Sequence, residues 1–224
     1  MNIKYSKQKK EIREDPVLDN LIKSKEFLQK HSNSVVGTII AAIVIFGIIT
    51  GFNYFKKSQQ ARAREDFGKA MIAYNEQKYV DAIDQFRMTA ENYKGTVTGA
   101  LSAYMLGSVL NQQGRYEEAI TWYESALKNR AIGFIGAQAY EGLAASYEML
   151  KDTATALENL EKALTDDRIE FRRNAIRWKI ALLNRKIDVA RTKKLCEEII
   201  ADTLAQDYKL NAEYLMATLQ DGNS

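Results

Sequence analysis

The sequence predicts an all-α protein: a single N-terminal transmembrane helix, followed by an α-solenoid of about three helical hairpins and a C-terminal helical cap. Two observations predict this class. An uncharged, strongly apolar run lies near the start of the chain, and one pattern of small and aromatic residues recurs three times after it. We therefore expect a leader over residues 1–33, a membrane helix over 34–55 and a repeat domain over 56–224.

The leader is basic, with eight Lys or Arg against five acidic residues. Asp15 can cap a helix that begins at Pro16, because proline lacks the N–H that the first helical position leaves unpaired. Apolar residues then follow at helical spacing among lysines, which predicts a short amphipathic helix over about residues 16–30. We expect this helix to lie on the membrane surface; docking onto a cytosolic face of a partner is the alternative.

The apolar run contains 24 residues without a charge, from Ser32 to Phe55, and eleven Ile, Val or Phe between Val35 and Phe52. A helix needs roughly 20 such residues to cross the bilayer. A buried core helix is the alternative, and a cleaved signal peptide would need a shorter leader and a small-residue exit. The run is therefore interpreted as an uncleaved anchor.

Small residues four apart mark one face of this span, at Gly37 and Ala41 and again at Gly47 and Gly51. Such spacing lets a second membrane helix approach closely. Glycine is also common in membrane spans, so ordinary composition is the alternative explanation.

The orientation of the span follows less directly from charge. The five lysines and arginines just after the span outnumber the three just before it, but large domains cross membranes largely regardless of charge and the leader is basic as a whole. We expect the amino terminus in the cytoplasm.

The remainder of the chain repeats one pattern of small and aromatic residues. The equivalent alanines Ala82, Ala119 and Ala156 are 37 residues apart both times. The clearest copy contains Leu106, Gly107, Leu110, Gly114, Arg115, Tyr116, Ala119, Ile120, Tyr123, Ala126 and Leu127. Small residues let two antiparallel helices approach, while the tyrosines fill the wedge toward the next hairpin. One hairpin cannot bury such a face alone, so neighbouring hairpins must stack.

These residues resemble the tetratricopeptide repeat, whose helix–turn–helix unit carries Leu-Gly, Tyr, Ala, an aromatic and Ala. The resemblance implies repeats at about 63–96, 100–133 and 137–170, with a degenerate cap over 171–220. Two features depart from it: the period is 37 residues where 34 is usual, and the proline that often closes a repeat is absent.

The whole layout is similar to a bacterial membrane-anchored family that includes the ancillary subunit of the Sec translocon. That resemblance implies a single-pass protein of the bacterial inner membrane with a periplasmic repeat domain, which acts as a scaffold at the export machinery.

If the array curves as tetratricopeptide arrays do, the first helices of the hairpins line a partner-binding groove. Its candidate residues are Arg64, Phe67, Met71, Tyr74, Leu101, Tyr104, Ser108, Asn111, Gln112, Glu141 and Glu148. Aromatic and amide side chains suit an extended segment or a helix of a partner protein. The alternative is that Phe67, Met71 and Tyr74 pack against the neighbouring hairpin.

A second candidate surface is a basic patch near the end of the repeats: Arg168, Arg172, Arg173, Arg177, Arg185 and Lys186. It would meet an acidic partner or anionic headgroups, unless it is only a solvated face. From Ser58 onward 22 basic residues face 24 acidic ones, so nucleic-acid binding is not expected.

The sequence indicates no enzyme, cofactor or small-molecule substrate. His31 is the only histidine and Cys196 the only cysteine, so neither a cysteine–histidine metal site nor a histidine-based triad can be assembled. We expect a non-enzymatic scaffold that recruits chaperones or unfolded clients at the Sec translocon or an envelope-assembly complex. A cytosol-facing anchored receptor for targeting segments is the alternative.

Overall fold

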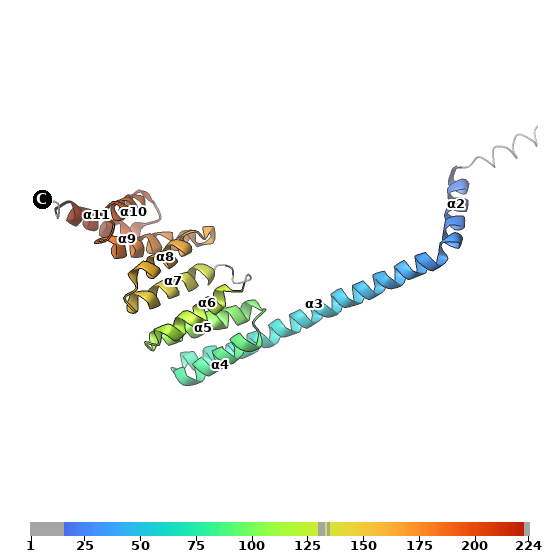
Figure 1. The fold of residues 1–224 in the computed structure, drawn as a ribbon, viewed down its shortest axis with the longest axis horizontal. Helices are drawn as coiled ribbons and strands as arrows, with labels where there is room; N and C mark the ends of the chain where they lie inside the picture. The colour runs from blue at the N-terminus through green and yellow to red at the C-terminus, as the bar shows by residue number, and fades with distance from the viewer. Residues whose placement is uncertain (1–15, 130–132, 134, 222–224) are drawn as a thin grey trace, which may run out of the picture. The chain divides into compact units, whose positions relative to one another are not determined.

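The computed structural model describes residues 16–129, 133 and 135–221, so the first half of the leader lies outside it. This part of the chain forms ten α-helices and one short 3-10 segment, and no strand occurs among its residues (Figure 1). The all-α class is therefore confirmed. The chain divides into two compact units, residues 1–57 and 58–224, which are described separately.

The first unit holds α2 (Pro16–Lys30) and the first part of α3 (Ser32–Asn75), with a turn at His31 between them. Leu21 and Phe27 of α2 are well exposed. The apolar part of α3 is long and apolar enough to cross a membrane, and none of it is buried within the protein. Gly37, Ala41, Gly47 and Gly51 are all exposed along it.

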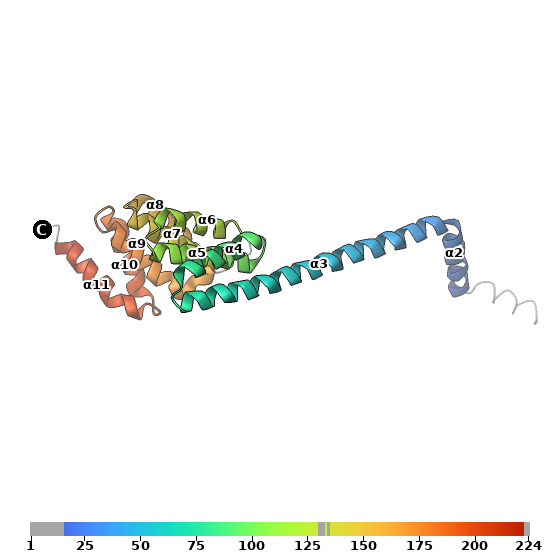
Figure 2. The ribbon, with the colours of Figure 1, turned by 90° about the horizontal axis from the view of Figure 1, so that it is seen from below.

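The second unit begins with the last part of α3 and continues as a stack of helices: α4 (Tyr79–Asn92), α5 (Val97–Gln112), α6 (Tyr116–Leu127), α7 (Ile135–Met149), α8 (Thr153–Leu164), α9 (Arg173–Asn184), α10 (Val189–Ala201) and α11 (Gln206–Asp221). The 3-10 segment η2 (Asp167–Arg172) joins α8 to α9. From α5 onward each helix packs on the one before it, and α5 also contacts α7 (Figures 1 and 2). This is the tetratricopeptide-like solenoid that the repeats predict.

Local chemistry explains where these helices start and turn. The Thr96 hydroxyl accepts a hydrogen bond from the Gly99 N–H, and Asp152 and Asp188 cap α8 and α10 in the same way. The turns between α3 and α4, α5 and α6, and α7 and α8 each contain a residue with positive φ, such as Gly114 at 75°. Glycine adopts this left-handed conformation without steric cost, which ends α5 and lets the chain reverse.

The core of the second unit depends on close helix packing around small residues. Ala119 and Ala126 of α6 are fully buried. The Tyr123 ring lies between Gly107 of α5 and Gly142 of α7, where an added Cβ would stand only 2.9 Å from the ring atom Cδ1 at Gly107 and 2.6 Å from Cε1 at Gly142. The predicted packing role of the small and aromatic residues is therefore confirmed.

Candidate protein-binding face

The first helices of successive hairpins lie next to one another and share polar contacts. We call the surface that they form the first-helix face; it comprises the outward residues of α3 after Ser58, α5, α7 and α9. Tyr74 and Gln112 are 3.3 Å apart across α3 and α5, and the Asn111 amide donates to Ser146 at 2.6 Å across α5 and α7. The two partners of each contact are 38 and 35 residues apart in the sequence, respectively, which is close to the length of one repeat.

The structure sorts the predicted groove residues into three groups by exposure. Arg64, Gln112 and Glu148 are exposed, and Glu141 is buried. The half-buried members are Phe67, Met71, Tyr74, Leu101, Tyr104, Ser108 and Asn111. A partner therefore reaches the exposed positions directly and the half-buried ones only through their outer atoms.

The aromatic members of this set pack inside the domain. The Phe67 ring lies 5.6 Å from the Phe86 ring, and the Tyr74 ring lies 6.0 Å from that of Tyr79. Tyr104 lies 5.9 Å from Tyr123, which also has a hydrogen bond with Ser108. Part of each aromatic surface thus stabilises the stack, as the packing alternative predicts.

Glu141 lies at the centre of an ion network that joins α7 to the end of η2 and to α9. Its side chain is only 5 % exposed, and it accepts hydrogen bonds from Arg172 Nε at 2.9 Å and from Lys179 Nζ at 2.8 Å. Burial alone would raise the pKa of Glu141, but the hydrogen bonds from the two cations outweigh it and lower the pKa. The carboxylate is therefore ionised and already held by its neighbours.

Tyr104 lies beside this network. Burial raises the pKa of its hydroxyl above the ordinary tyrosine value, and the nearby positive charge of Arg172 opposes the shift. The phenol remains neutral at physiological pH, so it offers a hydrogen-bonding hydroxyl on the first-helix face.

The predicted basic patch divides into paired and exposed residues. Arg172 pairs with Glu141, and Arg177 lies 3.1 Å from Glu198 and 3.6 Å from Asp202. Arg173 also interacts with the protein, whereas Arg185 and Lys186 are exposed beyond the end of α9. The side chain of Arg168 lies outside the described residues. Of these five residues, Arg172, Arg173 and Arg177 thus already have partners within the protein, whereas Arg185 and Lys186 are exposed.

Sequence reasoning missed a hollow of about 460 Å³ on the first hairpin, between α3 and α4. Exposed Ile72 and Met88 line it, together with Gln85, whose buried side-chain oxygen has no hydrogen-bond partner among the described residues. The only sequence signal is that Ile72 and Met88 fall outside the repeat pattern. Among the described residues no cluster of three or more His, Cys, Asp or Glu is arranged to hold a metal ion.

Comparisons with known proteins agree with this geometry. Residues 99–168 match the family model of the tetratricopeptide repeat. No curated protein matches the sequence at a significant level.

Solved structures share the fold at low sequence identity. A tetratricopeptide repeat protein from Parabacteroides merdae ATCC 43184 has a TM-score of 0.58 at 16% identity, over 71% of this chain and 60% of that one. The MamA protein has a TM-score of 0.57 at 14% identity, over 74% and 82% of the two chains. YrrB has a TM-score of 0.53 at 14% identity, over 70% and 76%. Residues 99–168 thus match the tetratricopeptide-repeat family model, and the described repeat domain has the fold of a tetratricopeptide-like solenoid.

Proposed function

We propose that this protein is a non-enzymatic, membrane-anchored scaffold whose first-helix face recruits other proteins. The observation that carries the proposal is the solenoid itself, because stacked helical hairpins present an extended surface suited to protein partners. The described residues hold no cluster arranged to bind a metal ion, and the most specific polar network, around Glu141, is satisfied within the domain.

The anchoring part of the proposal rests on α3. Its apolar segment is exposed throughout, which would be costly for a helix surrounded by water and is favourable for a helix surrounded by lipid. The span then crosses the bacterial inner membrane. With the basic leader in the cytoplasm, the repeat domain lies in the periplasm. The partners are then periplasmic chaperones or unfolded clients at the Sec translocon or an envelope-assembly complex.

The binding mode follows from the exposed positions on the first-helix face. YrrB, which has a similar fold, is described as a tetratricopeptide repeat protein with an unusual peptide-binding site. Here Gln112 and Glu148 offer exposed polar groups, and the half-buried Tyr104 and Leu101 offer partial apolar surface further along α5. An extended peptide segment would pack on Tyr104 and Leu101, and it would form hydrogen bonds with Gln112 and Glu148.

Photo-crosslinking in intact cells tests this face. A photoreactive residue at Gln112 or Glu148 should trap a discrete partner, whereas one at Glu124, an exposed position on α6, should not. The exposed positions are preferable to Phe67 or Tyr104, because replacing those would disturb the ring contacts of the core. Equal products at all three sites, or none, would contradict a binding face on the first helices.

A cytosol-facing receptor for targeting segments is the second candidate. It is favoured by the basic residues that follow the span, Lys56, Lys57, Arg62, Arg64 and Lys69, since such residues are enriched on the cytoplasmic side. A Glu124→Cys variant distinguishes the two orientations in spheroplasts, because the native Cys196 is fully buried. Labelling by a membrane-impermeant thiol reagent supports the periplasmic domain, and labelling only after lysis supports the receptor.

A further inference from the structure

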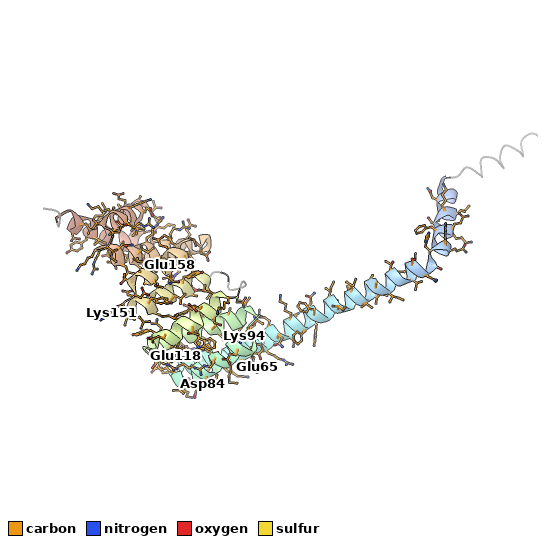
Figure 3. The ribbon with its side chains drawn as sticks, viewed as in Figure 1. Glu65, Asp84, Lys94, Glu118, Lys151 and Glu158 are labelled. Carbon is orange, nitrogen blue, oxygen red and sulfur yellow. The ribbon has the colours of Figure 1, made fainter. Side chains whose placement is uncertain are left out.

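A basic hollow lies at the edge of the repeat domain where one hairpin passes to the next. It has a volume of about 310 Å³ and lies among the end of α4, the start of α5 and the end of α6. Its lining comprises Ala90, Lys94, Gly99, Ala100, Ala103, Ser125, Lys128 and Asn129. We call it the inter-hairpin hollow. Lys94 lies on this edge in Figure 3, whereas Asp84, Glu118 and Lys151 lie toward the opposite edge.

The ionisable side chains that line the inter-hairpin hollow are all positively charged. Its only ionisable lining residues are Lys94 and Lys128, and both side chains are exposed. Neither ammonium group has an ion pair with a described residue. The hollow therefore presents two unneutralised positive charges beside a small cavity.

The backbone around the hollow is held in place by specific contacts. The Asn129 amide donates hydrogen bonds to the carbonyl oxygens of Lys94 at 3.1 Å and Thr96 at 2.8 Å. Gly99 packs so tightly that an added Cβ would stand 2.7 Å from the carbonyl carbon of Tyr93. The segments that carry the two lysines are thus tied together, while the small residues between them leave the space open.

Chain connectivity keeps this hollow close to the end of the apolar segment. The Gln60 amide donates a hydrogen bond to the Thr98 hydroxyl, next to Gly99 in the hollow lining. Phe55 ends the uncharged run only five residues before Gln60. Whatever the angle between the two units, five residues span at most about 18 Å. The chain that links the end of the apolar run to the hollow lining is therefore short.

We propose that the inter-hairpin hollow binds the phosphate of an anionic phospholipid headgroup. The inference rests on the proposed anchoring by α3. Lysine ammonium groups bind phosphate as point charges, and basic residues next to a membrane span are attracted to anionic lipids. Bound headgroups would hold this edge of the repeat domain at the membrane surface.

Lysine footprinting of the full chain in lipid nanodiscs tests the proposal. The protein is placed in discs of phosphatidylcholine alone or of phosphatidylcholine mixed with phosphatidylglycerol, and acylation rates of individual lysines are measured by mass spectrometry. Lys94 and Lys128 should react about five-fold more slowly in the anionic discs, as expected for about 1 kcal/mol of attraction per lysine. Lys151 and Lys209, which are exposed and lie outside the basic patch, should react equally in both and are internal controls.

A pair of double variants tests the same site through bound lipid. K94Q/K128Q should retain less phosphatidylglycerol than the parent in native mass spectrometry, whereas K151Q/K209Q, with the same change of charge, should retain as much as the parent. Equal retention by the two double variants would overturn the proposal and would indicate that Lys94 and Lys128 only stabilise the ends of α4 and α6.

Other outcomes separate this inference from the proposed function. Equal acylation of Lys94 and Lys128 in the two kinds of disc would overturn the headgroup site while the anchor stands. Protection by inorganic phosphate in phosphatidylcholine discs would assign the hollow to a free anion and overturn the lipid assignment. A full chain that fails to enter discs at all would refute the anchoring, and the headgroup inference with it.

Discussion

Replacing Gly142 by Ala should destabilise the repeat domain, although the same change usually stabilises a helix. The reason is the Tyr123 ring, which lies between Gly142 of α7 and Gly107 of α5. A new Cβ at Gly142 would stand 2.6 Å from Cε1 of this ring, and Gly107 also approaches the ring closely, which limits its movement.

The expected magnitude is a balance of two effects. Alanine in place of glycine inside a helix contributes about 0.5–1 kcal/mol of stability. Forcing an extra methyl into a packed core costs about 1–3 kcal/mol. Since Tyr123 is confined on both sides, the cost should prevail and leave a net loss of about 1–2 kcal/mol. Gly68 of α3 is a matched control: a Cβ there meets nothing within 4 Å, so Gly68→Ala should stabilise by about 0.5–1 kcal/mol.

Urea unfolding in mild detergent, followed by tryptophan fluorescence, measures both changes. The chain contains two tryptophans, Trp122 and Trp178, and both lie in the repeat domain, so the signal is free of the apolar segment. A second substitution, Tyr123→Leu, should remove much of the penalty of Gly142→Ala. If Gly142→Ala raises the urea midpoint as Gly68→Ala does, the sandwiched ring does not limit the packing of these helices and the reasoning is wrong.

Glu141→Gln should lower the free energy of unfolding by about 1–3 kcal/mol at pH 7, because charged hydrogen bonds from Arg172 and Lys179 are lost. Since the pKa of Glu141 is lowered by folding, its contribution is present above the unfolded value of about 4.3 and is lost as the pH falls through the folded pKa. The difference in urea midpoint between parent and variant should therefore shrink below about pH 4.3, and a difference that grows in acid would refute the assignment. Thr96→Ala should cost about 1 kcal/mol by removing the cap of α5, and Thr96→Ser should restore it in the same assay. Cys196 should resist thiol reagents in the native protein and react on unfolding, because it is fully buried and burial raises the pKa of its thiol; rapid native labelling would contradict the packing of α10.

Sequence patterns were sufficient for the fold because they operate over short distances. The spacing of Ala119, Tyr123 and Ala126 defines one face of a helix within two turns, and the 37-residue recurrence requires that such faces stack. The same patterns indicated that Gly107 lets the two helices of its hairpin approach closely. The second glycine at the Tyr123 ring, Gly142, was not identified, since it belongs to the next hairpin and its role depends on how the hairpins stack.

The candidate face was predicted less completely. Positions such as Gln112 and Glu148 are exposed on the first helices, but Glu141, chosen by the same rule, is buried and paired. Its partners are 31 and 38 residues further along the chain. Arg177 likewise belongs to a cluster of basic residues in the sequence, yet in the fold it lies beside Glu198 and Asp202.

The sequence by itself determined the apolar segment, the helical hairpins and the need for them to stack, because hydrophobicity and helical spacing are properties of neighbouring residues. Only the tertiary structure decided which charges pair, which aromatic rings are committed to the core and where a basic hollow remains open. These depend on the offset between successive hairpins, which brings residues about one repeat apart into contact. A side chain on the predicted face is free for a partner only where that offset leaves it without a neighbour of opposite charge.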